Sequence, residues 1–150
     1  MVDMPSMHDG VVKIRRGRRT DLPGILALLT PTAPVIRDKA QARHWRRLAG
    51  DPGLDFYVAE QNGVILGALL VCYVRALREH GWRAILDLLL LPPSPCALGQ
   101  DLVNFAKARA RKRGCRQLIA WRREAAENGH LATLTQGGFH LIGEVLSCEL

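Results

Sequence analysis

The sequence predicts a mixed α/β fold, in which a twisted sheet of about six strands carries helices on both faces. The stretch from Arg83 to Trp121 has the pattern of a strand, a proline turn, a helix and a second strand. Two apolar runs flank Gln61–Gly63, where an Asn-Gly pair suits a tight hairpin turn. A parallel crossover beside an antiparallel hairpin defines a mixed sheet.

The size and composition of the chain indicate one globular unit. With 150 residues it has the length of a single domain, which we expect over residues 11–150, after a flexible N-terminus of residues 1–10. The longest apolar run, Val64–Val74, is shorter than the ~20 residues of a membrane span, and residues 1–10 lack the pattern of a signal peptide. We therefore predict a soluble, cytoplasmic protein with no membrane partner.

The cysteines give no indication of a metal site. The chain has four, at positions 72, 96, 115 and 148, and no Cys-x-x-Cys pair. Structural zinc sites draw their ligands from such closely spaced pairs. We expect no metal and no disulfide framework, which fits a reducing compartment.

The N-terminal third begins with a strand and two helices. Val11–Arg16 alternates apolar and polar residues, as a half-buried strand does. Thr20 or Asp21 can cap the helix that follows. A second, basic helix is predicted over Asp38–Leu48. Their inward faces are formed by Leu22, Ile25, Leu26, Leu28 and Leu29 in the first helix and by Ala42, Trp45 and Leu48 in the second.

The predicted hairpin joins strands Leu54–Ala59 and Val64–Val74, and a loop over Arg75–Gly81 leads to the central unit. There, Arg83–Leu91 is an apolar run closed by prolines, which is typical of a buried strand. The helix after it has a single apolar face, ends in cations and is followed by Gly114, a residue suited to a helix C-cap. That apolar face consists of Leu98, Leu102, Val103, Ala106 and Ala110.

The chain is predicted to close with three more elements. Cys115–Trp121 is the strand that completes the crossover, and Glu124–Thr135 has the spacing of a short helix. Gly137 and Gly138 end that helix. Phe139–Leu150 is then predicted to be the last strand, with a kink at Gly143.

Asp87 is the one carboxylate within the central leucine run. A buried carboxylate costs free energy unless it is paired, so the residue is either functional or in an ion pair with Arg75 or Arg83. His80, in the preceding loop, is a second candidate because histidine exchanges protons near neutral pH. An inert loop histidine is the alternative.

The net charge of +7 comes from basic clusters at Lys13–Arg19, Arg37–Arg47 and Lys107–Arg123. Such clusters either bind anionic partners or form solvated helix faces. Because Phe105 and Trp121 near the last cluster have the pattern of core residues, a nucleic-acid partner is not favoured.

With these elements in place, the chain resembles the GNAT superfamily of acyl-CoA-dependent N-acyltransferases from Val11 to Leu150. The resemblance rests on the order and spacing of Asp21–Pro23, Phe56–Gly67, Leu86–Pro92, Ala108–Cys115 and Gly138–Phe139. It implies acetyl-CoA as co-substrate and an amine, on a small molecule or a peptide, as acceptor. Whether the protein forms a homodimer is left open by the sequence.

The resemblance also implies which residues form the site. In the family, the backbone of the central strand, here Leu88, Leu89 and Leu90, pairs with the pantetheine amides, and the following helix start holds the pyrophosphate. A carboxylate takes the amine proton, a role that falls to Asp87 with His80 beside it. The other implied cofactor-binding residues are Cys96, Ala97, Leu98, Gly99, Gln100 and Asn128.

The chain departs from the family pattern at two places. The phosphate-loop pattern Arg/Gln-x-x-Gly-x-Gly/Ala is degenerate, because Pro93–Gly99 keeps only its last glycine. Leu134 stands where the family usually has a tyrosine that serves as the general acid. These departures favour a second interpretation, in which the protein is a catalytically inactive binding or regulatory module. A third interpretation is a basic nucleic-acid-associated protein.

Overall fold

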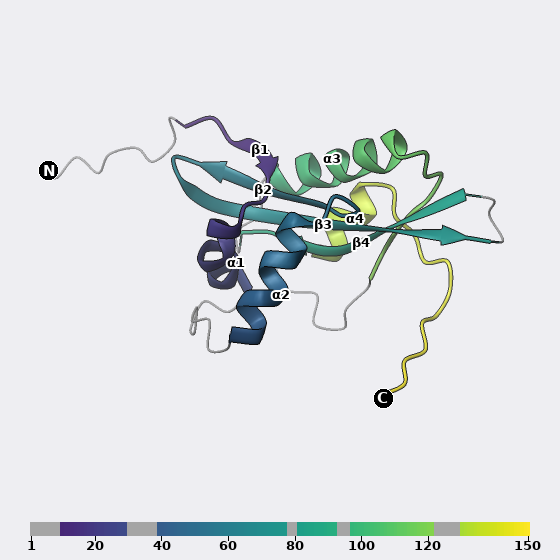
Figure 1. The fold of residues 1–150 in the computed structure, drawn as a ribbon. Helices are drawn as coiled ribbons and strands as arrows, with labels where there is room; N and C mark the ends of the chain where they lie inside the picture. The colour runs from purple at the N-terminus through teal and green to yellow at the C-terminus, as the bar shows by residue number, and fades with distance from the viewer. Residues whose placement is uncertain (1–9, 30–38, 78–80, 93–96, 122–129) are drawn as a thin grey trace, which may run out of the picture.

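The structure is a computed structural model that describes residues 10–29, 39–77, 81–92, 97–121 and 130–150. It confirms the mixed α/β fold, with five strands in the order β1-β2-β3-β4-β5 (Figure 1). The elements are β1 (Lys13–Arg16), η1 (Arg19–Asp21), α1 (Leu22–Leu29), α2 (Lys39–Gly50), β2 (Asp55–Gln61), β3 (Val64–Ala76), β4 (Gly81–Leu90), α3 (Leu98–Lys112), β5 (Leu118–Ala120) and α4 (His130–Gln136).

The sheet combines an antiparallel meander with one parallel crossover. β1 to β4 pair antiparallel with their neighbours, and β5 pairs parallel with β4 after the helix α3. The hairpin between β2 and β3 turns at Asn62 and Gly63, whose φ angles of 52° and 80° are those of the predicted type I′ turn. The sequence pattern therefore predicted both connections.

α3 covers one face of the sheet together with α4. Its predicted apolar stripe is buried, from Leu98 at 7% exposure to Leu102 at 0%, against Leu69 and Leu89 of the sheet. Gly114 ends the helix with a φ of 80°, and the N–H of Cys115 donates to the carbonyl of Ala110 at 3.0 Å.

α1 and α2 cover the opposite face (Figure 1). α1 buries Ile25 among Phe56 and Val58 of β2. All of α2 is described, and none of its residues is fully buried. Its main anchor is Trp45, whose ring meets that of Phe56 edge-on at a centroid distance of 5.0 Å. Of the described helices, none combines the length and apolar composition that crossing a membrane requires.

The predicted last strand, Phe139–Leu150, is wrong. These residues are described and adopt no regular secondary structure, and Leu141, Val145 and Leu146 are 71%, 69% and 93% exposed. A strand needs a neighbour for its backbone groups, and β5, the last strand of the sheet, is only three residues long. The N-terminal part of the predicted helix Glu124–Thr135 lies outside the described residues; the described part is α4.

Candidate active site

A β-bulge interrupts β4 at Asp87. Leu70 of β3 lies opposite Leu88, and its neighbour Val71 lies opposite Leu86, so that Asp87 is the extra residue between the two pairs. A bulge bends its strand and redirects the side chains that follow it. The one carboxylate of the leucine run thus occupies the irregular position of the central strand.

The pairing between β4 and β5 ends at the same point. Its ladder runs from Ala84 opposite Leu118 to Leu86 opposite Ala120. β4 continues to Leu90 without a β5 partner in the described residues. The parallel pairing therefore does not run the full length of β4, and in the described residues the backbone N–H and C=O groups of Leu88–Leu90 lie on an open edge.

The bulge corrects two expectations about Asp87. The side chain is exposed, not buried. In a regular strand, strict alternation would also place Asp87 on one face with Ile85 and Leu89, yet Leu89 packs with Leu86 in the cluster under α3. The extra residue shifts the alternation by one position, because two residues of the bulged strand oppose one residue of its partner.

The charge of Asp87 acts on the face that α1 and α2 cover. Burial raises the pKa of the Cys72 thiol, and the negative charges of Asp87 and Asp51 raise it further. Cys72 packs against the cluster on that face. Arg75, one of the two predicted ion-pair partners, lies over the ring of Trp82 instead, with its guanidinium carbon 4.7 Å from the ring centroid.

The first turn of α3 is the predicted phosphate-binding element. Its first helical hydrogen bond in the described residues runs from the N–H of Asp101 to the carbonyl of Ala97 at 3.2 Å. The preceding N–H groups, on Leu98, Gly99 and Gln100, belong to the turn whose donors have no partner within a helix. They make this end of α3 an electrostatically positive site for an anion, which the carboxylate of Asp101 in the same turn opposes.

Gly99 has a packing role that sequence reasoning missed. A Cβ atom at this position would lie 2.9 Å from Cγ2 of Thr133 in α4. Beside it, the side-chain amide of Gln100 donates to the carbonyl of Thr133 at 3.0 Å and to Oε1 of Gln136 at 3.1 Å. α4 therefore lies directly on the first turn of α3, where only a glycine leaves enough space.

We predict that Gly99→Ala lowers the free energy of unfolding by about 1–3 kcal/mol, because the added methyl group overpacks the contact with Thr133. The double variant Gly99→Ala/Thr133→Ser removes the methyl group that clashes, so it should recover most of the loss. Urea denaturation of the two single variants and the double variant measures this coupling. Purely additive effects would contradict the packing explanation.

The remaining predicted site residues divide into two groups. His80, Cys96 and Asn128 lie outside the described residues. Leu134, at the position of the family tyrosine, is 4% exposed and packs in the cluster under α3. Its side chain belongs to the core.

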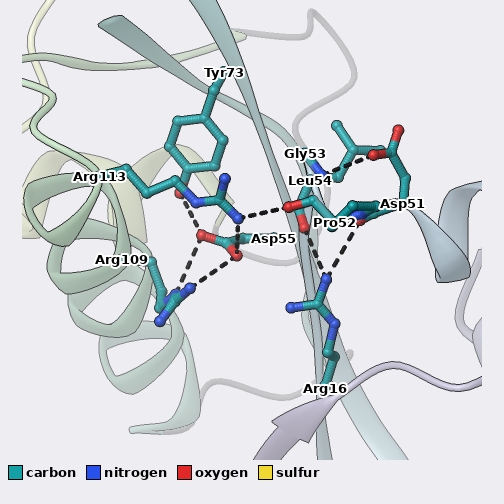
Figure 2. A network of polar contacts seen from close by, with 9 residues as sticks. All are labelled: Arg16, Asp51, Pro52, Gly53, Leu54, Asp55, Tyr73, Arg109 and Arg113. Atoms are coloured by element: carbon teal, nitrogen blue, oxygen red, sulfur yellow. Dashed lines mark hydrogen bonds and ion pairs between the residues drawn. The ribbon is translucent and has the colours of Figure 1, made fainter.

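A network around Asp55 lies outside the predicted site (Figure 2). Asp55 begins β2, is 0% exposed, and accepts hydrogen bonds from Tyr73 Oη at 2.5 Å and Arg109 Nη2 at 3.1 Å. Arg113 Nη2 donates to the same carboxylate at 3.1 Å and to the carbonyl of Pro52 at 3.0 Å. These bonds tie the C-terminal turns of α3 to β2 and β3, about three helical turns from the predicted phosphate site.

The chain belongs to the acetyltransferase (GNAT) family, whose model matches residues 22–134. That match includes the bulge at Asp87, the open edge of β4 and the first turn of α3, so the site described above lies within the family's own domain. A search of curated proteins finds no match.

Solved structures with the same fold include acetyltransferases. A transcriptional regulator from Bacillus halodurans C-125 has a TM-score of 0.80 and 23% identity, covering 93% of this chain and 100% of its own. A glucosamine-6-phosphate N-acetyltransferase from Arabidopsis thaliana has a TM-score of 0.75 and 18% identity, covering 93% and 98%. An aminoglycoside N-acetyltransferase in complex with CoA has a TM-score of 0.73 and 14% identity, covering 98% of each chain. At these identities the similarity shows the fold.

Proposed function

We propose that this protein is an acetyl-CoA-dependent N-acetyltransferase, which transfers an acetyl group to an amine on a small molecule or a peptide. The observation that carries the proposal is the bulge at Asp87, together with the edge of β4 that follows it, which has no β5 partner in the described residues. The bulge sets an exposed carboxylate next to backbone groups that are open to a ligand. Membership of the GNAT family supports the same reaction.

The residues present fit acetyl-CoA. The backbone of Leu88–Leu90 offers N–H and C=O groups on an open strand edge, which suits the two amides of pantetheine. The N–H groups at the start of α3, from Ala97 to Gln100, suit its pyrophosphate. We include Cys96 in the binding site because it directly precedes the start of α3 in the sequence, and Asn128 because the resemblance to the family implies it.

In the proposed reaction, acetyl-CoA supplies the acetyl group as a thioester, which the free amine attacks directly. Asp87 receives the proton that the amine loses, either directly or through a water molecule. Its exposed position lets solvent carry the proton away. His80 is the proposed second proton carrier, since the imidazole titrates near neutral pH. The core position of Leu134 leaves protonation of the departing thiolate to solvent.

The free thiols of Cys72, Cys115 and Cys148 support a reducing compartment, and we propose that the protein acts in the cytoplasm. A catalytically inactive GNAT module remains the second candidate, favoured by the buried Leu134. Acetyl-CoA binding is expected of the enzyme, and only the enzyme forms an acetylated product.

We predict that acetyl-CoA binds, but with a Kd roughly 10–100-fold weaker than in family members with a complete glycine loop, because Pro95 removes one N–H donor from the phosphate loop. Calorimetry and thermal shift measure the binding, and mass spectrometry of a panel of amines detects the product. The absence of heat and of any shift at millimolar acetyl-CoA would exclude the enzyme. Binding without product from any amine would favour the inactive module.

A further inference from the structure

Four arginines converge on one hollow outside the candidate active site. Arg19 of η1 and Arg43, Arg46 and Arg47 of α2, together with Gly50, line an open hollow of about 480 Å³. Their side chains come from two segments more than twenty positions apart in the sequence. The fold, and not a local charge run alone, brings the four arginines to one hollow.

The anchoring of α2 explains this convergence. Trp45 points inward onto Phe56, and its indole N–H donates to the carbonyl of Arg19 at 3.2 Å. This bond joins η1 to the middle of α2. Because Arg43, Arg46 and Arg47 lie within two positions of Trp45, they are held beside Arg19, on the solvent side of the helix.

In the part of the chain that the structure describes, no ion pair joins an arginine of the hollow to a carboxylate. The carboxylates of Asp21, Glu60 and Asp55 are in ion pairs with Arg15, Arg109 and Arg113, none of which lines the hollow. Asp21 of η1 is held by Arg15 at 2.8 Å, and Asp51, next to Gly50, accepts from the N–H of Gly53 at 2.7 Å. α2 itself has no acidic residue.

Arginine cannot relieve this repulsion by losing its proton at physiological pH. Guanidinium groups also present parallel N–H donors that match the oxygens of a phosphate group. We propose that the hollow binds a compact polyanion carrying at least two linked phosphate groups, either a free di- or triphosphate or the phosphate chain of a nucleotide. The site is separate from that proposed for acetyl-CoA, because α2 and α3 lie on opposite faces of the sheet.

Calorimetry of the full chain with tripolyphosphate tests the proposal. The variant Arg43→Gln/Arg46→Gln should weaken binding by about tenfold or more, since each charge-assisted hydrogen bond contributes strongly to affinity. The matched control Arg111→Gln/Lys112→Gln removes the same charge from exposed positions at the end of α3. It should change Kd by less than about twofold. Thermal melts verify that each variant is folded.

The proposal would be overturned in favour of a solvated basic face if the two double variants weakened tripolyphosphate binding equally, or if the unaltered protein did not bind tripolyphosphate. Tripolyphosphate and ATP identify the source: equal affinity indicates recognition of the phosphate chain alone, and tighter ATP binding adds a nucleoside contact. Binding of a single-stranded oligonucleotide without tripolyphosphate binding would replace the compact ligand with an extended one and refute the hollow as its site.

The acetyl-CoA affinity of the Arg43→Gln/Arg46→Gln variant separates this proposal from the proposed enzymatic function. It should equal that of the unaltered protein. If acetyl-CoA binding weakened in parallel with tripolyphosphate binding, the hollow would be part of the cofactor site and the proposal of a second site would fail.

Discussion

Asp87→Asn should lower kcat for acetyl transfer by roughly 10²–10⁴, with the Kd of acetyl-CoA unchanged. Asparagine keeps the shape of the side chain and removes the group that accepts the amine proton. Because the carboxylate is exposed and lies at a bulge, its loss should leave the melting temperature unaltered. Steady-state kinetics with an amine identified in the product screen measures the effect.

Asp51→Asn is the matched control for this experiment. Asp51 is also exposed, and its charge acts on Cys72 as that of Asp87 does. Removing it changes the electrostatics of the same face without touching the bulge. A full rate in the Asp87 variant, or an equal loss in both variants, would remove Asp87 from the mechanism as a specific base.

The second large effect concerns stability. Asp55→Asn should lower the free energy of unfolding by about 3 kcal/mol, because it leaves two guanidinium groups without the carboxylate that compensates them. The value is at the low end for buried ion pairs since Arg109 and Arg113 keep side-chain exposures of 24% and 30%. Tyr73→Phe removes one hydrogen bond from the same carboxylate and should lower the free energy of unfolding by about 1 kcal/mol.

Urea denaturation of the two variants compares these costs. A loss for Asp55→Asn no larger than that for Tyr73→Phe would show that the ion pairs contribute nothing beyond one hydrogen bond. The acetyl-CoA affinity should be the same in both variants, because the network contacts the last turns of α3 and the proposed cofactor site uses its first turn.

The same carboxylate makes stability depend on pH. Burial alone would raise the pKa of Asp55, but the hydrogen bonds from Arg109, Tyr73 and Arg113 outweigh it and hold the pKa below its usual range. A carboxylate whose pKa is lowered by folding stabilises the protein above its unfolded pKa of about 3.9, and this stability is lost as pH falls through the folded value. The unaltered protein should therefore lose more stability below about pH 4 than Asp55→Asn does.

Much of the fold could be predicted because its signals are local. The hairpin turn depends only on the φ angles that Asn62 and Gly63 adopt, and the apolar stripe from Leu98 to Ala110 depends only on the helical period. The bulge could not be predicted, because the extra residue is defined by its partner strand and the leucines on both sides of Asp87 fit either face. Sequence reasoning therefore found the carboxylate and misjudged its burial and its face.

The Asp55 network and the arginine hollow were missed because their members are distant in the sequence. Asp55 lies 54 positions from Arg109 and 18 from Tyr73. One indication was present: Arg109 of α3 and Arg113, the residue that caps its C-terminus, are four positions apart and share the side of the buried Ala106 and Ala110. Cations next to a core stripe are stabilised by a carboxylate on the facing sheet, and Asp55 at the start of β2 supplies it.

The weak packing of α2 against the sheet affects the dynamics of the molecule. A helix that buries no residue fully and relies on Trp45 for its attachment opens locally at a small fraction of the global free energy of unfolding. Its amide hydrogens should exchange with solvent well before those of β3, whose Ala68, Leu69 and Val71 are 0% exposed. We therefore expect α2 to open and close while the sheet and α3 stay folded.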